Sequence, residues 1–170
     1  MYPEEILFGD EQVGKSSIVR QYVHSDYSEN YILTIGVDIS LKTLSIQSIK
    51  GENLKIKFQI WDTPGNIRFQ DFISPLCKGA SGIIFVFDVG RRKTLEKIYA
   101  LNKIIEDSYS KTLSKVLVGN KCDNIREVSF EEAMQTSNKL GMIYIEVSAK
   151  YNIGMNEIFQ ALINLRTSDE

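Results

Sequence analysis

Hydrophobic and polar positions follow two different periods along this chain. Three segments, 82–88, 116–119 and 143–147, are almost continuously apolar, which is typical of strands covered on both faces of a sheet. Two further segments, 36–49 and 54–61, alternate with a period near two on either side of polar turn residues. This second pattern predicts a β-hairpin.

Helical periodicity fills the stretches between the expected strands. Segments 93–109, 130–140 and 155–166 place apolar residues three and four positions apart. Ser129 fits the N-cap of the second helix, and Gly141 fits its end. Strands that alternate with helices predict an α/β fold with a mostly parallel six-stranded sheet and helices on both faces. The length of 170 residues suits a single domain spanning 1–170.

Composition and charge exclude several classes of protein. Hydrophobic residues make up 43% of the chain and charged residues 25%, which is ordinary for a globular protein. The net charge of −2 argues against a general nucleic-acid binder. Acidic residues stand where a signal peptide needs a basic end, and no apolar run approaches the ~20 residues of a membrane span. Cys77 and Cys122 have no metal-ligand spacing, so we expect reduced thiols in a cytoplasmic protein.

The clearest chemical signal is the segment Gly9-Asp10-Glu11-Gln12-Val13-Gly14-Lys15-Ser16, which matches the phosphate-loop pattern G-x-x-x-x-G-K-[ST]. It follows an apolar run at 6–8 and precedes a helix-like run at 17–23, the context that this motif requires. Lys15 offers a charge to the terminal phosphates, and Ser16 offers an oxygen to Mg²⁺. The loop N–H groups are expected to surround the phosphates. The predicted nucleotide-binding residues of this segment are Glu11, Gln12, Val13, Gly14, Lys15, Ser16 and Ser17.

A second motif, Asp62-Thr63-Pro64-Gly65, follows the strand expected at 54–61. Asp62 can hold Mg²⁺ through water, across from Ser16, and Gly65 can offer its N–H to a terminal phosphate because no side chain blocks the approach. Taken alone, the four residues are equally typical of an ordinary turn.

Two further motifs point to the base. The first is Asn120-Lys121-Cys122-Asp123, which follows the strand at 116–119. The Asp123 carboxylate can accept two N–H bonds from the edge of guanine that carries two donors, and adenine has no such edge. Asn120 can tie this loop to the phosphate loop, and the stem of Lys121 can lie over the base. Ser148, Ala149 and Lys150 follow the last strand and can add a backbone N–H. A surface turn remains the alternative for each motif alone, and an ATP-using kinase or ATPase is the rival for the phosphate loop.

With these motifs in this order, the chain resembles the small Ras-superfamily GTPases, and most of all the Rab branch, over residues 6–165. The resemblance implies a P-loop NTPase G domain that binds GTP and GDP with Mg²⁺ and acts as a slow GTPase switch in vesicle trafficking. It implies that Thr34 binds Mg²⁺ and the γ-phosphate, that Tyr27 stacks on guanine and that Tyr31 folds over the phosphates. It also implies an exchange factor, a GTPase-activating protein and effectors that bind through residues 28–39 and 62–78.

The sequence departs from the family pattern where catalysis is decided. Asn66 stands where the family carries the glutamine that orients the attacking water, and Pro64 precedes it in place of alanine. We therefore expect slow hydrolysis that uses Lys15 and either Asn66 or, as a substitute, Gln12. The alternative is a G domain that holds nucleotide as a binding module and scarcely turns it over.

Other departures concern charge and partners. Glu11 adds a negative charge to the phosphate loop and is expected to point to solvent, and the run at 91–93 is expected to be a solvated helix entry. Ile39 and the pair Leu76-Cys77 replace aromatic residues of the Rab effector surface. The last residues contain no cysteine, so we expect membrane attachment only if a lipidated tail is missing from the sequence. The expected location is the cytoplasm, with a peripheral place on the cytosolic face of endomembranes.

Overall fold

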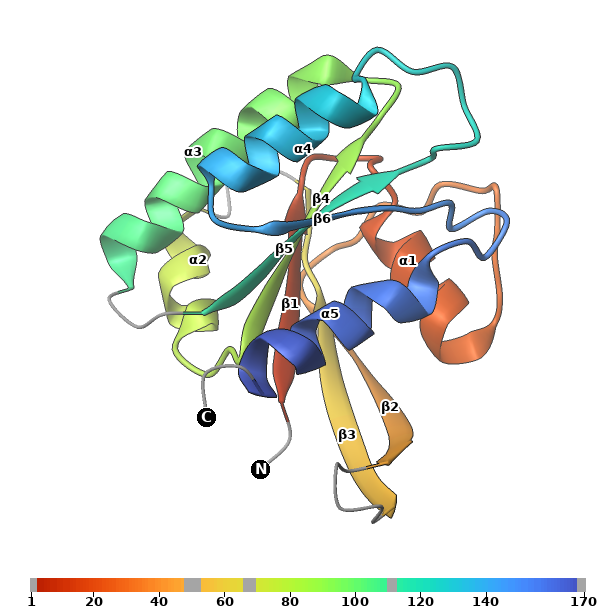
Figure 1. The fold of residues 1–170 in the computed structure, drawn as a ribbon, viewed down its shortest axis with the longest axis vertical. Coiled ribbons are helices and arrows are strands. Elements are labelled where there is room, and N and C mark those ends of the chain that lie inside the picture. The colour runs from red at the N-terminus through yellow and green to blue at the C-terminus, as the bar shows by residue number, and fades with distance from the viewer. Residues whose placement is uncertain (1–2, 48–52, 66–69, 110–112, 168–170) are drawn as a thin grey trace.

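The computed structural model describes residues 3–47, 53–65, 70–109 and 113–167, which form a six-stranded sheet with helices on both faces (Figure 1). The strand order is β2-β3-β1-β4-β5-β6, with β2 antiparallel to β3 and every other neighbouring pair parallel. The predicted fold class is therefore confirmed. The strands are β1 (Glu4–Gly9), β2 (Asp38–Gln47), β3 (Asn53–Asp62), β4 (Gly82–Asp88), β5 (Ser114–Asn120) and β6 (Ile143–Glu146). The helices are α1 (Lys15–His24), α2 (Gln70–Cys77), α3 (Arg92–Ser108), α4 (Phe130–Lys139) and α5 (Met155–Thr167).

The side chains of the central strands separate the core into two layers because successive residues of a strand point to opposite faces. Ile83, Phe85 and Phe87 of β4 pack on the face covered by α2, α3 and α4. Ile84 and Val86 pack on the other face, under α1 and α5. Strand β4 is buried along its whole length, as its continuous apolar run predicts.

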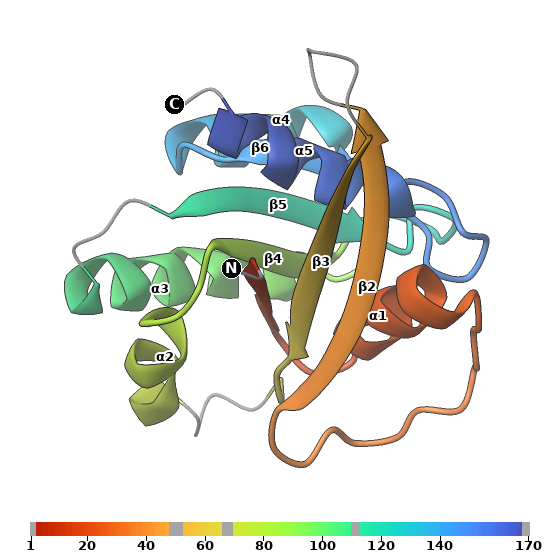
Figure 2. The same ribbon diagram turned by 90° about the horizontal axis from the view of Figure 1, so that it is seen from below.

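The predicted hairpin is present, with β2 and β3 paired from Asp38 opposite Asp62 to Gln47 opposite Asn53. Figure 2 shows these two long strands side by side, crossing the front of the molecule. Most of the expected turn lies in 48–52, outside the described residues. The segment that joins α1 to β2 contains no helix or strand.

Helix α4 begins and ends where the sequence predicts. The Ser129 side chain accepts a hydrogen bond from the Glu132 N–H at 3.1 Å, and Glu131 and Glu132 occupy the first turn. Gly141 follows the helix in a left-handed conformation with φ of 64°. Helix α2 is absent from the prediction because Pro75 lies inside it, and proline normally marks a helix boundary. None of the helices in the described part of the chain is long and apolar enough to cross a membrane.

Candidate functional site

The predicted motifs meet at one edge of the sheet, because β1, β3, β4, β5 and β6 all end there. Two cavities of about 250 and 220 Å³ lie beside these ends and share four lining residues. The first is lined by residues of the phosphate loop, the 25–34 segment and Gly65. The second is lined by the predicted base-binding residues. Together they reach the size of ordinary small-molecule sites, ~300–1,000 Å³.

The N-terminus of α1 faces the first cavity without a side-chain cap. Its cap residue, Gly14, has a left-handed φ of 94°, and a Cβ there would lie 2.2 Å from Asn120 Nδ2. Glycine is therefore needed at this position. A helix N-terminus with unpaired N–H groups and no acidic residue in its first turn favours an anion such as phosphate.

Lys15 is buried and lies across the phosphate loop. Its Nζ donates hydrogen bonds to the carbonyl oxygens of Gly9 at 3.0 Å and Asp10 at 2.8 Å. Burial lowers the pKa of Lys15 to about 8, an effect that the nearby charges of Asp62, Asp10 and Glu11 partly oppose. A phosphate beside this ammonium would add a further negative charge and favour the charged lysine.

Three oxygen-bearing side chains predicted to bind Mg²⁺ converge beside Lys15. The Ser16 hydroxyl lies 3.0 Å from Thr34 Oγ1 and donates a short hydrogen bond to Asp62 Oδ2. The other Asp62 carboxylate oxygen is buried without a hydrogen-bond partner, and burial raises the pKa of Asp62. An unpartnered buried carboxylate oxygen next to two hydroxyls fits a hard divalent cation, either directly or through water.

The segment after β3 is pressed against the phosphate loop. The Thr63 hydroxyl donates to the Leu7 carbonyl at 2.6 Å, which anchors the segment to β1. A Cβ at Gly65 would lie only 2.4 Å from Glu11 N, so the two backbones touch at this point. Asn66, the predicted water-positioning residue, lies outside the described residues.

The predicted base-binding residues are connected to the phosphate loop, because Asn120 joins the two loops as expected. The buried Asn120 donates from Nδ2 to the Val13 carbonyl at 2.8 Å and accepts from the Ala149 N–H at 3.2 Å. Ser148 donates to Asp123 Oδ1 at 2.5 Å, which leaves the other carboxylate oxygen for a ligand. The Ala149 N–H, one of the three backbone donors that the sequence offers at 148–150, is therefore already used by Asn120.

Other predicted residues border the two cavities. Tyr27, Ser17 and Lys121 line both, and Lys150 lines the second cavity only. Lys150 also forms an ion pair of 2.8 Å with Glu29, which lines the first cavity.

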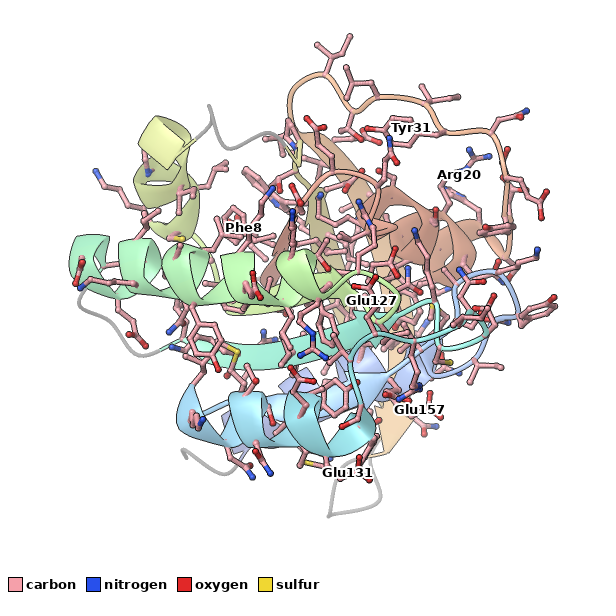
Figure 3. The ribbon with its side chains drawn as sticks, turned by 90° about the horizontal axis from the view of Figure 1, so that it is seen from above. Phe8, Arg20, Tyr31, Glu127, Glu131 and Glu157 are labelled. Carbon is pink, nitrogen blue, oxygen red and sulfur yellow. The ribbon has the colours of Figure 1, made fainter. Side chains whose placement is uncertain are left out.

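The loop that carries Tyr31 arches over α1, and Arg20 of α1 lies beneath it (Figure 3). Tyr31 lines the first cavity but is 55% exposed. The structure thus brings Tyr31 to the phosphate end of the site without closing it over that end.

The sequence did not predict the contacts around the carboxylate of Asp88. The buried carboxylate of Asp88 pairs through Oδ2 with Arg91 Nε at 3.1 Å and Lys121 Nζ at 2.7 Å. Arg91 Nη2 donates to the Glu11 carbonyl at 2.8 Å, and Lys121 Nζ donates to the Gln12 carbonyl at 2.7 Å. The interpretation of the 91–93 run as a merely solvated helix entry is therefore wrong for Arg91. The acid at the end of β4 is the only local signal for this set.

The two unusual residues of the phosphate loop differ in placement. Gln12 is exposed and has a left-handed φ of 60°. Glu11 is half-buried and lines the first cavity, so the prediction that it simply points to solvent does not describe it.

A larger cavity of about 460 Å³ lies on the other side of the 63–65 segment, against α2 and α3. It is lined mainly by apolar side chains such as Trp61, Ile73 and Leu76, and it lacks the convergent donors of the smaller cavities. Cys77 is fully buried, and burial raises the pKa of its thiol to about 11, so this residue adds no exposed side chain to the 62–78 segment.

The chain is similar to known proteins over most of its length. A sequence model of the Ras family matches residues 4–167. GTP-binding protein ypt2 of Schizosaccharomyces pombe is 34% identical over 92% of this chain and 77% of its own. Ras-related protein Rab-13 of Canis lupus familiaris is 35% identical over 92% of this chain and 76% of its own. Ras-related protein SEC4 of Saccharomyces cerevisiae is 35% identical over 94% of this chain and 73% of its own. The similarity thus extends far beyond the phosphate loop.

Proposed function

The chain belongs to the Ras family, and on that premise we propose that it is a Rab-like guanine-nucleotide switch whose nucleotide site is the pair of cavities described above. It is a small GTPase, which binds GTP and GDP and hydrolyses GTP. The observation that carries the assignment of the site is the meeting of the uncapped α1 N-terminus, Lys15 and the Asp123 loop at one edge of the sheet.

Phosphate binding is assigned to the loop N–H groups of residues 11–17, to Lys15 and to Gly65. Mg²⁺ is assigned to Ser16, Thr34 and Asp62, because their oxygens converge and one Asp62 oxygen is left unpartnered. The ion would neutralise charge on the β- and γ-phosphates. Lys15 and the loop N–H groups would stabilise the charge that develops on the γ-phosphate oxygens during attack by water.

Base recognition is assigned to the loops at 120–123 and 148–150, with Tyr27 against the base. The Asp123 oxygen that does not accept from Ser148 can accept an N–H from guanine, and a backbone N–H nearby can donate to the base. The ATP-using rival is disfavoured because adenine would leave this carboxylate unpaired.

Hydrolysis is proposed to be slow. The Asn66 amide is shorter than that of glutamine by one carbon–carbon bond, about 1.5 Å, and a misplacement of about 1 Å costs on the order of 100-fold in rate. Gln12 is a weaker candidate for orienting water, because it is exposed and Lys121 holds its carbonyl.

The proposed setting is vesicle trafficking on the cytosolic face of endomembranes, as the Rab relationship suggests. Regulators and effectors are assigned to residues 28–39 and 62–78. Ile32 and Ile35 are 73% and 90% exposed, and large apolar side chains displayed together in this way favour a binding surface.

The site is tested by displacing a fluorescent GDP derivative with GDP, GTP and ATP in the presence of Mg²⁺. We expect displacement by both guanine nucleotides and none by ATP at the same concentration. Asp123→Asn should lose guanine selectivity and gain affinity for xanthine nucleotides, because an amide offers one donor and one acceptor to the base. Equal displacement by ATP would refute the assignment of Asp123.

The catalytic assignment is tested by single-turnover hydrolysis of bound GTP. Asn66→Gln should accelerate hydrolysis, with Gln12→Ala as the comparison for the other candidate. A rate that Asn66→Gln leaves unchanged and Gln12→Ala abolishes would transfer the role to Gln12.

A further inference from the structure

Glu11 occupies a constrained place at the phosphate end of the site. Its backbone is held on one side by Arg91, which donates to its carbonyl at 2.8 Å. On the other side the Gly65 backbone approaches so closely that a Cβ there would lie 2.4 Å from Glu11 N. Residue 11 therefore cannot shift far from the site without disturbing both neighbours.

Glu11 borders the nucleotide site and is only partly exposed to solvent. It is half-buried and lines the cavity that Lys15, Ser16, Thr34 and Gly65 also line. Its negative charge reaches the Lys15 ammonium, where it helps to raise the pKa of that lysine against the effect of burial.

The neighbouring acid, Asp10, is in a different situation. Its carboxylate pairs with Lys97 of α3 at 2.8 Å and lines the larger apolar cavity on the far side of the loop. No described residue forms an ion pair with the Glu11 carboxylate, whose charge is therefore left to act on whatever enters the cavity.

We propose that Glu11 determines the nucleotide preference of this protein by repelling the third phosphate, so that GDP is held more tightly than GTP. The inference rests on the proposed function, since the third phosphate must lie near Lys15, Thr34 and Gly65. GTP brings about one more negative charge than GDP to that end of the cavity. Two like unit charges ~7 Å apart at an effective dielectric of ~35 change an equilibrium by about tenfold.

The experiment measures one ratio: the Kd of a GTP analogue with an imido bridge between its β and γ phosphates, divided by the Kd of GDP. Both constants come from displacement of fluorescent GDP in the presence of Mg²⁺. The ratio should exceed one in the parent and fall on the order of tenfold in Glu11→Gln, which removes the charge at nearly constant size. Glu11→Asp retains the charge and should keep the parental preference.

Glu131→Gln is the matched control, because it removes an exposed acid from the first turn of α4. Figure 3 shows Glu131 at the opposite side of the molecule from Tyr31. This variant should keep the parental ratio.

Three results would overturn the proposal: an unchanged ratio in Glu11→Gln, a higher ratio in that variant, or an equal fall in Glu131→Gln. If the parent binds neither nucleotide, the proposed function fails as well. Binding of both nucleotides with an unchanged ratio refutes the role of Glu11 alone.

Discussion

Gly65→Ala tests the contact between the segment after β3 and the phosphate loop. A Cβ at this position would lie 2.4 Å from Glu11 N, 2.5 Å from Glu11 Cα and 2.6 Å from the Asp10 carbonyl carbon. Ordinary contacts of a Cβ begin at 3.4 Å. The two segments must therefore separate by about 1 Å to bring the new methyl group to that distance.

The size of the expected effect follows from that displacement. The atoms that the new methyl group meets belong to backbone, so no side-chain rotation can relieve the overlap. Arg91 holds Glu11 from the other side. A misplacement of about 1 Å at a reacting centre costs on the order of 100-fold in rate, so hydrolysis of bound GTP should fall by about that factor.

The assay is single-turnover hydrolysis, with binding of the imido analogue of GTP as a second readout in case the parental rate is already low. GDP affinity should change little, because GDP lacks the phosphate that Gly65 is proposed to contact. Gly79→Ala is the matched control. A Cβ there also meets an atom at 2.4 Å, but that atom is Glu4 Oε2, the free end of a flexible side chain. If Gly65→Ala retains parental hydrolysis and parental analogue binding, the reasoning is wrong.

Three further predictions concern the surroundings of the site and the core. Arg91→Ala removes a hydrogen bond to the Glu11 carbonyl worth roughly 1 kcal/mol after allowance for exposure, and should speed GDP release about fivefold; an unchanged release rate would contradict this. Phe159→Ala removes a fully buried ring whose centroid lies 3.8 Å from that of the stacked Tyr22 ring. The free energy of unfolding in urea, measured with saturating GDP, should fall by about 3–5 kcal/mol, and a fall below about 1 kcal/mol would contradict this. Burial raises the pKa of Glu5 above its ordinary 4.5, despite its pairing with Arg166. The folded state thus binds this proton more tightly, so the stability of the parent relative to Glu5→Gln should fall as pH rises from 4.5 through the raised pKa; a difference that is independent of pH would refute this.

Local patterns predicted the features that depend on neighbours in the chain. The caps of α4 follow from Ser129 and Gly141, and the buried strand β4 follows from its apolar run. The bond from Asn120 to Val13 could be predicted because both belong to motifs of fixed order.

Features that depend on distant pairs gave no such signal. Arg91 and Glu11 are 80 positions apart. The sequence alone therefore predicts an exposed charge for an arginine at the start of a helix, because its partner is not visible there. Helix α2 was missed because Pro75 normally argues for a boundary, whereas here its neighbours Ile73 and Cys77 bury that helix against the core.

The long-range contacts explain how the phosphate loop keeps its shape. Four consecutive residues of the loop are each held by one cationic or amide side chain from a later element. The pairs are Asp10 with Lys97, the Glu11 carbonyl with Arg91, the Gln12 carbonyl with Lys121 and the Val13 carbonyl with Asn120. Because the carbonyl and N–H of a trans peptide point in opposite directions, holding three successive carbonyls toward α3 and β5 turns the intervening N–H groups toward the cavity. The anion site is therefore organised by the protein itself, and the free energy of nucleotide binding need not be spent on shaping the loop. The same contacts fix the backbone of Glu11, so the residue proposed to oppose the third phosphate is anchored at the same loop as the groups that attract it.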